Sequence, residues 1–162
     1  HWAHYRTDDI ISWELLPCAM APDEVYDAGG YFSGSALETE KGHVLMYTEV
    51  MLETDADGFP YAKQQAIAIG DGETYHKLAD NPVITSDMLP EGCSREDFRD
   101  PKIWKENDRY YALMANRSVT GGDKRSSILR RIWSIGALHR YLTTAADNTV
   151  KCGNGTVSVE DA

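Results

Sequence analysis

The sequence predicts an all-β protein made of short antiparallel strands. From Tyr31 onward, short runs rich in aromatic, aliphatic and β-branched residues recur at close intervals, as the strands of such proteins do. Turn-forming Gly, Asp, Asn and Pro separate these runs, and start and stop signals of helices are scarce. Successive antiparallel strands of this length are typical of a β-propeller or a β-sandwich.

Residues 1–17 predict an outer strand that runs into a loop. Ile11, Trp13 and Leu15 alternate with polar residues, which is the period of a strand with one buried face. The segment opens without Met, so we expect the natural chain to begin further upstream.

The middle of the chain predicts a series of strands joined by tight turns. The predicted strands are residues 31–37, 44–52, 65–69, 74–78 and 83–85. Their turn signals are residues 40–42, 55–58, 71–72 and 81–82. A further strand, turn and strand follow at residues 102–105, 106–108 and 109–115.

The pattern changes near residue 122. Residues 123–162 carry six basic and four acidic side chains, a balance of +2, whereas the residues before them carry −12. Residues 126–132 are apolar and basic, and the rest is rich in Thr, Ala, Gly and Asn, so we predict no strand after residue 122. We therefore divide the chain into a β domain at residues 1–122 and an irregular, poorly ordered tail at residues 123–162.

Composition excludes several classes of function. At 162 residues and 42% apolar content the chain has room for one domain with a modest core. Its net charge of −10 opposes binding to nucleic acid and to anionic membranes, so we expect neither partner. Cys18, Cys93 and Cys152 lack the spacing of a disulfide framework or a zinc site, which favours a reducing compartment.

Three clusters carry polar groups that could form a site. A Ser beside Gly, as in Phe32-Ser33-Gly34-Ser35, most often hydrogen-bonds its own turn, and the frame of a serine nucleophile is absent. Phe98-Arg99-Asp100-Pro101 reads either as a solvated ion pair that ends a loop or as a fork and a carboxylate facing the hydroxyls of a sugar. His1-Trp2-Ala3-His4 has no third ligand nearby, so we expect structural histidines and no metal.

Taken together and in order, these pieces resemble glycoside hydrolase family 32, the invertases, levanases and sucrose-6-phosphate hydrolases. The resemblance covers residues 1 to about 117 and is closest to the bacterial sucrose-6-phosphate hydrolase branch. Its clearest parts are F-S-G-S-A and F-R-D-P-K-[IV]-W, which stand some sixty residues apart. The family's H-W-G-H, W-x-x-L-P and Q-x-I-A segments are matched by residues 1–4, 13–17 and 65–68, with Ala3 in place of the usual Gly.

The resemblance implies a partial five-bladed β-propeller. The chain would supply the end of blade one, all of blade two and the first half of blade three. It also implies that the parent protein hydrolyses β-fructofuranosidic bonds with retention of configuration, without metal or organic cofactor. Sucrose, sucrose 6-phosphate or a fructan would be its small-molecule or oligosaccharide partner.

The resemblance assigns four site residues. Asp100 corresponds to the family's transition-state stabiliser, while Arg99 and Ser33 would bind the sugar and Phe32 would form an apolar wall of the same subsite. The family's nucleophile would lie upstream of His1, and its acid/base Glu belongs to an E-C-P motif that this chain lacks. We therefore expect the isolated chain to be inactive.

The family pattern also bears on the tail. A one-base shift in reading frame lets the codons of Arg131–Gly136 and Thr149–Asn154 encode segments that resemble the family at those points. This predicts that the tail is out-of-frame family sequence, with a divergent but genuine C-terminus as the alternative.

Two other interpretations of the whole chain remain. One is a non-catalytic fructoside-binding or interaction module, and the other, among enzymes, is the five-bladed arabinanase and xylosidase group. We expect a cytoplasmic location, with secretion left open.

Overall fold

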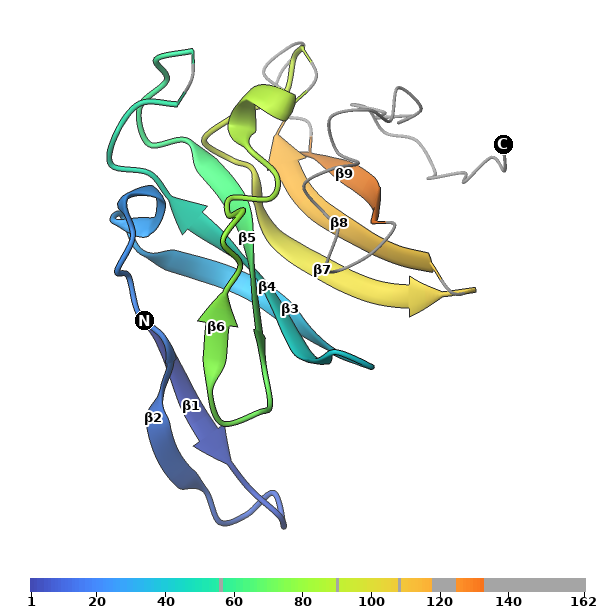
Figure 1. Cartoon of the computed structure of the whole chain (residues 1–162). Helices are drawn as coiled ribbons and strands as arrows, with labels where there is room; N and C mark the ends of the chain where they lie inside the picture. Colours follow the sequence, from blue (N-terminus) through green and yellow to red (C-terminus); the bar gives the residue numbers. More distant parts are fainter. Residues whose placement is uncertain (56, 90, 108, 118–124, 133–162) are drawn as a thin grey trace.

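The computed structural model describes residues 1–55, 57–89, 91–107, 109–117 and 125–132, the last of these by its backbone only. It contains three antiparallel sheets (Figure 1). Strands β1 (Trp2–Arg6) and β2 (Glu14–Met20) form a hairpin. Strands β3 (Tyr31–Thr39), β4 (Gly42–Val50), β5 (Lys63–Gly70) and β6 (Tyr75–Lys77) form a four-stranded meander. Strands β7 (Arg99–Glu106), β8 (Arg109–Arg117) and β9 (Arg125–Ile132) form a three-stranded one.

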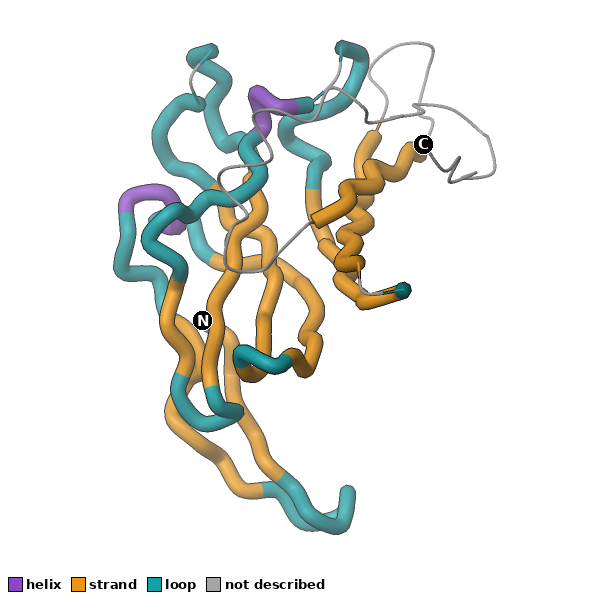
Figure 2. The backbone as a smooth tube through the Cα atoms, turned by 45° about the vertical axis from the view of Figure 1, so that its right-hand side comes forward, coloured by secondary structure: helices purple, strands orange, loops and turns teal. Residues whose placement is uncertain are grey.

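The prediction of an all-β chain is confirmed in the described part. Its helical elements are two single 3₁₀ turns, η1 (Val25–Asp27) and η2 (Ser86–Met88), drawn in purple in Figure 2. None of the helices in this part is long and apolar enough to cross a membrane. The predicted turns fall between strands, and Gly42 and Gly72 take φ values of 110° and 94° that side chains rarely adopt.

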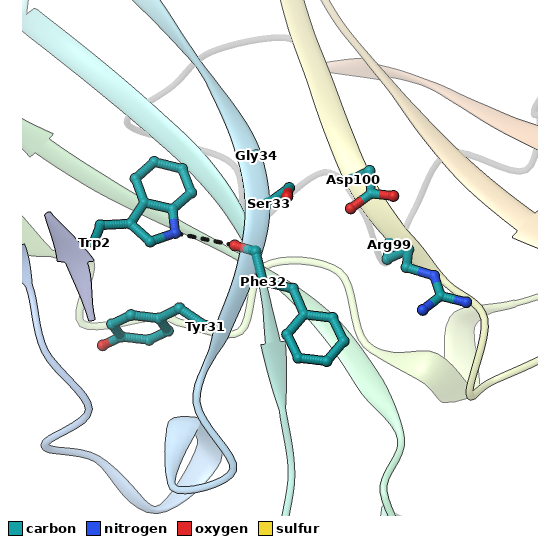
Figure 3. A pocket seen from close by; sticks show the side chains of 7 residues that line it. All are labelled: Trp2, Tyr31, Phe32, Ser33, Gly34, Arg99 and Asp100. Carbon is teal, nitrogen blue, oxygen red and sulfur yellow. Dashed lines mark hydrogen bonds between the residues drawn. The ribbon is translucent and has the colours of Figure 1, made fainter.

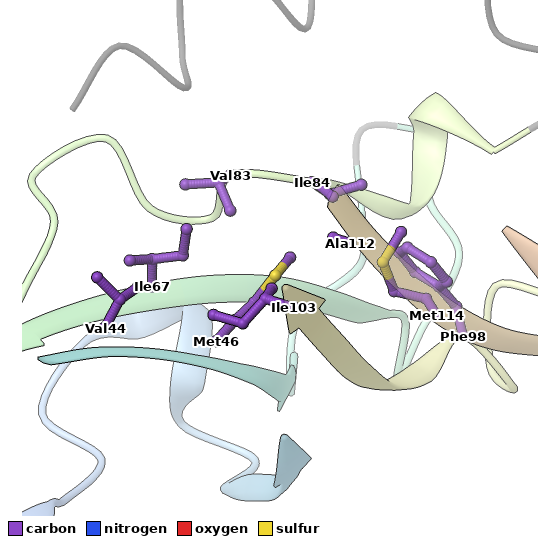
Figure 4. Packing of buried hydrophobic residues seen from close by; sticks show 9 residues of the cluster. All are labelled: Val44, Met46, Ile67, Val83, Ile84, Phe98, Ile103, Ala112 and Met114. Carbon is purple, nitrogen blue, oxygen red and sulfur yellow. The ribbon is translucent and has the colours of Figure 1, made fainter. Parts of the chain in front are cut away.

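The main core lies between the two meanders. Val44, Met46 and Ile67 of β4 and β5 pack against Ile103, Ala112 and Met114 of β7 and β8 (Figure 4). Val83, Ile84 and Phe98 of the connecting segment complete this core. Successive side chains of a strand point to opposite faces, so Leu45 and Tyr47 face the other way, toward the β1–β2 hairpin. Strand β4 is therefore buried on both faces.

The strands predicted within residues 1–17 and at residues 83–85 are confirmed only in part. Residues 1–17 contain β1 and the start of β2, with a turn between them. Ile10 and Ile11 lie in the β1–β2 turn and are 79% and 85% exposed. The Asp9 carboxylate accepts hydrogen bonds from the amides of Ile11 and Ser12, and this local turn prevails over the apolar alternation. Residues 83–85 contribute one isolated bridge, Ile84 to Gln65, because η2 begins directly after them.

The expectation that no strand follows residue 122 was also wrong. Strand β9 pairs with β8 without a break, from Tyr110 opposite Ile132 to Arg117 opposite Arg125. The open edge of β8 supplies backbone partners whatever the side-chain pattern of the incoming strand. The third sheet thus has three strands where the resemblance predicts half a blade. Residues 133–162 lie outside the described residues, so the predicted tail and its reading frame stay predictions.

Candidate functional site

A cavity of about 750 Å³ lies where β3 and β7 begin, beside β1 (Figure 3). Its lining brings together all four residues singled out in the sequence, Phe32, Ser33, Arg99 and Asp100. Trp2, Tyr31 and Gly34 complete the lining. The two halves of the site come from strands that belong to different sheets.

The β3 half of the site sits in a break of strand register. Between Tyr31 opposite Glu49 and Gly34 opposite Tyr47, strand β3 advances by one residue more than β4. Such a bulge turns side chains away from their regular directions, which presents Phe32 and Ser33 to the cavity. From strand β1, the indole of Trp2 donates a hydrogen bond to the Phe32 carbonyl of β3 at 3.0 Å (Figure 3).

The β7 half of the site also sits in a break of strand register. Between Arg99 opposite Ala115 and Lys102 opposite Leu113, strand β7 also gains one residue over its partner. Asp100 lies in this bulge with φ = 58°, a left-handed conformation that is uncommon outside Gly and that Asn and Asp tolerate best among the other residues. In Figure 3 the Asp100 carboxylate lies across the cavity from Ser33, and the Phe32 ring and the Arg99 guanidinium project from the β3 side and the β7 side of the same cavity.

An acidic side chain holds Arg99 in place. Asp97 forms an ion pair with Arg99 and also accepts hydrogen bonds from Arg117 Nε at 2.6 Å and Ser94 Oγ at 3.3 Å. Burial alone would raise the pKa of Asp97, but Arg117, Arg99 and Ser94 together lower it below its usual value. Asp97 therefore stays charged and orients the guanidinium at the cavity wall.

Aromatic rings form the apolar part of the wall. Phe32 is 41% exposed, and the ammonium of Lys63 lies 5.5 Å from its ring centroid. Burial and the nearby Arg99 lower the pKa of Lys63. Tyr31 is fixed by its hydroxyl, which lies 2.7 Å from the buried Asp27 carboxylate and 2.8 Å from the Ala21 carbonyl.

A buried acid lies beside this wall on β4. Glu49 is opposite Tyr31 in the sheet and is fully buried. Neither of its carboxyl oxygens has a hydrogen-bond partner among the described residues, and the same holds for the Tyr47 hydroxyl. Burial, with a contribution from the charge of Asp27, raises the pKa of Glu49 to about 9, so this carboxyl is neutral near pH 7.

Sequence reasoning missed three lining residues, Trp2, Tyr31 and Gly34. Trp2 stands in the H-W-A-H segment and Gly34 in F-S-G-S-A, so the signal that could have found both is their membership of these two motifs. Gly34 is required by close packing, because a Cβ there would lie 2.1 Å from the Met46 carbonyl oxygen. Tyr31 gave no signal beyond its place next to Phe32.

The arrangement suits a neutral ligand rich in hydroxyl groups. A carboxylate, a guanidinium and a serine hydroxyl supply acceptors and donors, and charged partners make such hydrogen bonds strong. The exposed aromatic rings supply apolar surface for the carbon face of a ring. Across the part of the chain that the structure describes, no three His, Cys, Asp or Glu side chains lie together as metal ligands would.

Comparison with known proteins gives consistent matches. The model of the glycosyl hydrolases family 32 N-terminal domain matches residues 1–128. A sucrose-6-phosphate hydrolase of Zymomonas mobilis is 33% identical over 120 residues, which is 73% of this chain and 22% of that protein. A levanase of Bacillus subtilis is 34% identical over 138 residues, which is 76% of this chain and 17% of that protein.

Solved structures agree with these relatives. A Bombyx mori β-fructofuranosidase in complex with sucrose is 34% identical, with a TM-score of 0.67 over 83% of this chain and 26% of that one. A sucrose-6-phosphate hydrolase from Lactobacillus gasseri is 29% identical, with a TM-score of 0.68 over 82% of this chain and 25% of that one. The chain thus spans about a quarter of the length of these proteins.

Proposed function

The chain belongs to glycoside hydrolase family 32, with its sheets forming part of a β-propeller, and on that premise we propose that it is part of an enzyme hydrolysing β-fructofuranosidic bonds. Its substrate would be sucrose, sucrose 6-phosphate or a fructan. The observation that carries the proposal is the convergence of Ser33, Arg99 and Asp100 on one cavity from two sheets. The number of blades stays a prediction.

In this proposal the cavity holds the fructosyl ring. Asp100 accepts hydrogen bonds from ring hydroxyls and stabilises the positive charge that develops on the sugar as the glycosidic bond breaks. Arg99 and Ser33 hold further hydroxyls, and Phe32 packs against the ring. Retaining hydrolysis also needs a nucleophilic carboxylate and an acid/base carboxyl, and we assign neither role to a described residue.

Fructose binding by the chain tests the proposal. Titration calorimetry with fructose and sucrose should detect saturable binding that falls about 10- to 100-fold in Asp100→Asn and Arg99→Ala, because each change removes a charge-assisted hydrogen bond. Asp80→Asn is the matched control, since Asp80 is exposed and does not line the cavity. Equal binding by wild type and both site variants would contradict the proposal.

A second candidate is a fructoside-binding module without catalysis. It is favoured by the lining of the described cavity, which holds groups suited to bind a sugar but a single carboxylate, Asp100, whereas retaining hydrolysis uses a pair. The natural full-length protein separates the two candidates. Fructose release from sucrose supports the hydrolase, and tight binding with no release supports the module.

A further inference from the structure

Two polar side chains are buried directly behind Asp100. Thr48 of β4 and Gln65 of β5 are opposite each other in the sheet, and both are fully buried. They occupy the face of the sheet that carries Met46 and Ile67, which pack in the main core. Burying polar groups among apolar ones is unfavourable unless each has a hydrogen-bond partner. The partners of Thr48 and Gln65 therefore indicate the structural role of these two side chains.

The contacts form one chain of hydrogen bonds that ends on the β7 bulge. The amide of Asp100 donates to Thr48 Oγ1 at 3.0 Å, and Thr48 Oγ1 donates to Gln65 Oε1 at 2.8 Å. The other end of the Gln65 amide, Nε2, donates to the carbonyl of Phe98 at 3.1 Å. The pair therefore holds two backbone groups on either side of Arg99, the carbonyl of Phe98 and the amide of Asp100.

Asp100 needs such support because its own side chain has none. Among the described residues no hydrogen bond or ion pair to its carboxylate occurs, so the backbone alone sets the Cα–Cβ bond from which the carboxylate projects. That backbone is left-handed, at φ = 58°, in a bulge that precedes Pro101. Conformations of this kind persist only where surrounding contacts determine them.

We infer that Thr48 and Gln65 are positioning residues that fix the left-handed backbone of Asp100 and so aim its carboxylate into the sugar cavity. This inference rests on the proposed function for the role of Asp100. Neither side chain lines the cavity, so both act through the backbone of Asp100 rather than on the sugar.

The test compares two substitutions at residue 48 in the same chain. Thr48→Val has the same shape without the hydroxyl, and Thr48→Ser keeps the hydroxyl. NMR reports the Asp100 backbone through amide hydrogen exchange and the one-bond Hα–Cα coupling, which is sensitive to the sign of φ. We expect Thr48→Val to speed exchange of the Asp100 amide about tenfold, change the coupling and weaken fructose binding about tenfold. Thr48→Ser should keep the amide exchange rate, the Asp100 coupling and fructose binding at their wild-type values.

Ser35→Ala is the matched control. Ser35 Oγ accepts a hydrogen bond from the Ile103 amide at 2.9 Å, which is another tie between β7 and the four-stranded sheet. Its loss should lower stability by a similar amount and leave the Asp100 coupling unchanged. If Thr48→Val does not fold, Gln65→Met removes the same chain of bonds from its other end and is measured in the same way.

The outcomes separate the inference from the proposed function. An unchanged Asp100 coupling in Thr48→Val, or an equal change in Ser35→Ala, would overturn the positioning role. A displaced Asp100 in Thr48→Val, together with no fructose binding by the wild-type chain, would uphold the positioning of Asp100 and count against a fructose site.

Discussion

The backbone of Asp100 adopts a conformation that costs folding stability, at a position where the carboxylate lines the cavity. Every residue except Gly carries some steric cost at φ = 58°, although Asp and Asn tolerate it better than most, and Asp100 occupies this conformation at the cavity. Strain at a site suits a residue kept for its carboxylate rather than for its contribution to folding.

We expect Asp100→Gly to be more stable than Asp100→Ala by about 1 kcal/mol, because only Gly adopts a positive φ without a steric penalty. Both variants lack the carboxylate, so the difference isolates the backbone. Urea denaturation of the two proteins measures it. Equal midpoints would show that the backbone at residue 100 relaxes to a negative φ once the Asp is removed.

Glu49 gives a prediction about pH. Its pKa in the folded protein is about 9, chiefly because of burial and to a lesser extent because of Asp27, while Lys77 partly offsets both. Its ordinary value is 4.5. A carboxyl with a raised pKa leaves stability unchanged below its unfolded-state pKa, and the folded state loses stability progressively as the pH rises from about 4.5 toward 9.

Glu49→Gln removes that titration while keeping the size of the side chain. We expect the variant to exceed wild type in free energy of unfolding by about 3 kcal/mol at pH 7, with the gap shrinking to near zero at pH 4.5. Denaturation across this pH range measures the gap, and Glu53→Gln at an exposed position is the control. A gap independent of pH would mean that Glu49 is already charged or already paired in the fold.

Among the elements, β3 and β7 carry the site because each has a bulge at the same end. Gly34 belongs to the β3 bulge, where a side chain would meet the Met46 carbonyl at 2.1 Å. Backbone on the neighbouring strand cannot move aside as a flexible side chain can. The close approach of β3 and β4 therefore depends on this glycine.

Gly34→Ala should lower the free energy of unfolding by roughly 2–3 kcal/mol and weaken fructose binding, because β3 must shift with Phe32 and Ser33 attached. Gly58→Ala is the matched control. Gly58 has φ = 81° but open space around its Cα, so only backbone strain of about 1 kcal/mol is expected there. Thermal denaturation and calorimetry measure both variants, and equal effects would argue against the packing explanation.

In the whole molecule, strand β4 contributes side chains to both hydrophobic clusters, one on each of its faces. Strand β4 is buried on both faces, and Trp2 of the hairpin packs edge-on against Tyr47 of β4 while bonding the Phe32 carbonyl. The hairpin, the four-stranded sheet and the three-stranded sheet thus all contribute to the cavity. The cavity exists only when the three sheets are assembled.

The isolated 162-residue chain is expected to bind fructose without hydrolysing sucrose, because we propose Asp100 in the described cavity as a transition-state stabiliser and propose no described residue as nucleophile or acid/base. A coupled assay for glucose and fructose measures release. Release above a blank, lost in Asp100→Asn, would show that other residues of this chain supply those two carboxyl groups.

The sequence by itself determined the all-β class and the strands and turns of residues 31–78 and 102–115, and its motifs, through their resemblance to the family, singled out four residues that line the cavity. These follow from local causes, since alternation, turn chemistry and short motifs act over a few neighbouring residues. Only the tertiary structure decided the β1–β2 hairpin, the strand β9, the places of Trp2 and Tyr31 in the cavity, and the support of Asp100 by Thr48 and Gln65. Each of those depends on groups distant in sequence that meet across strands, and no local pattern records such a meeting.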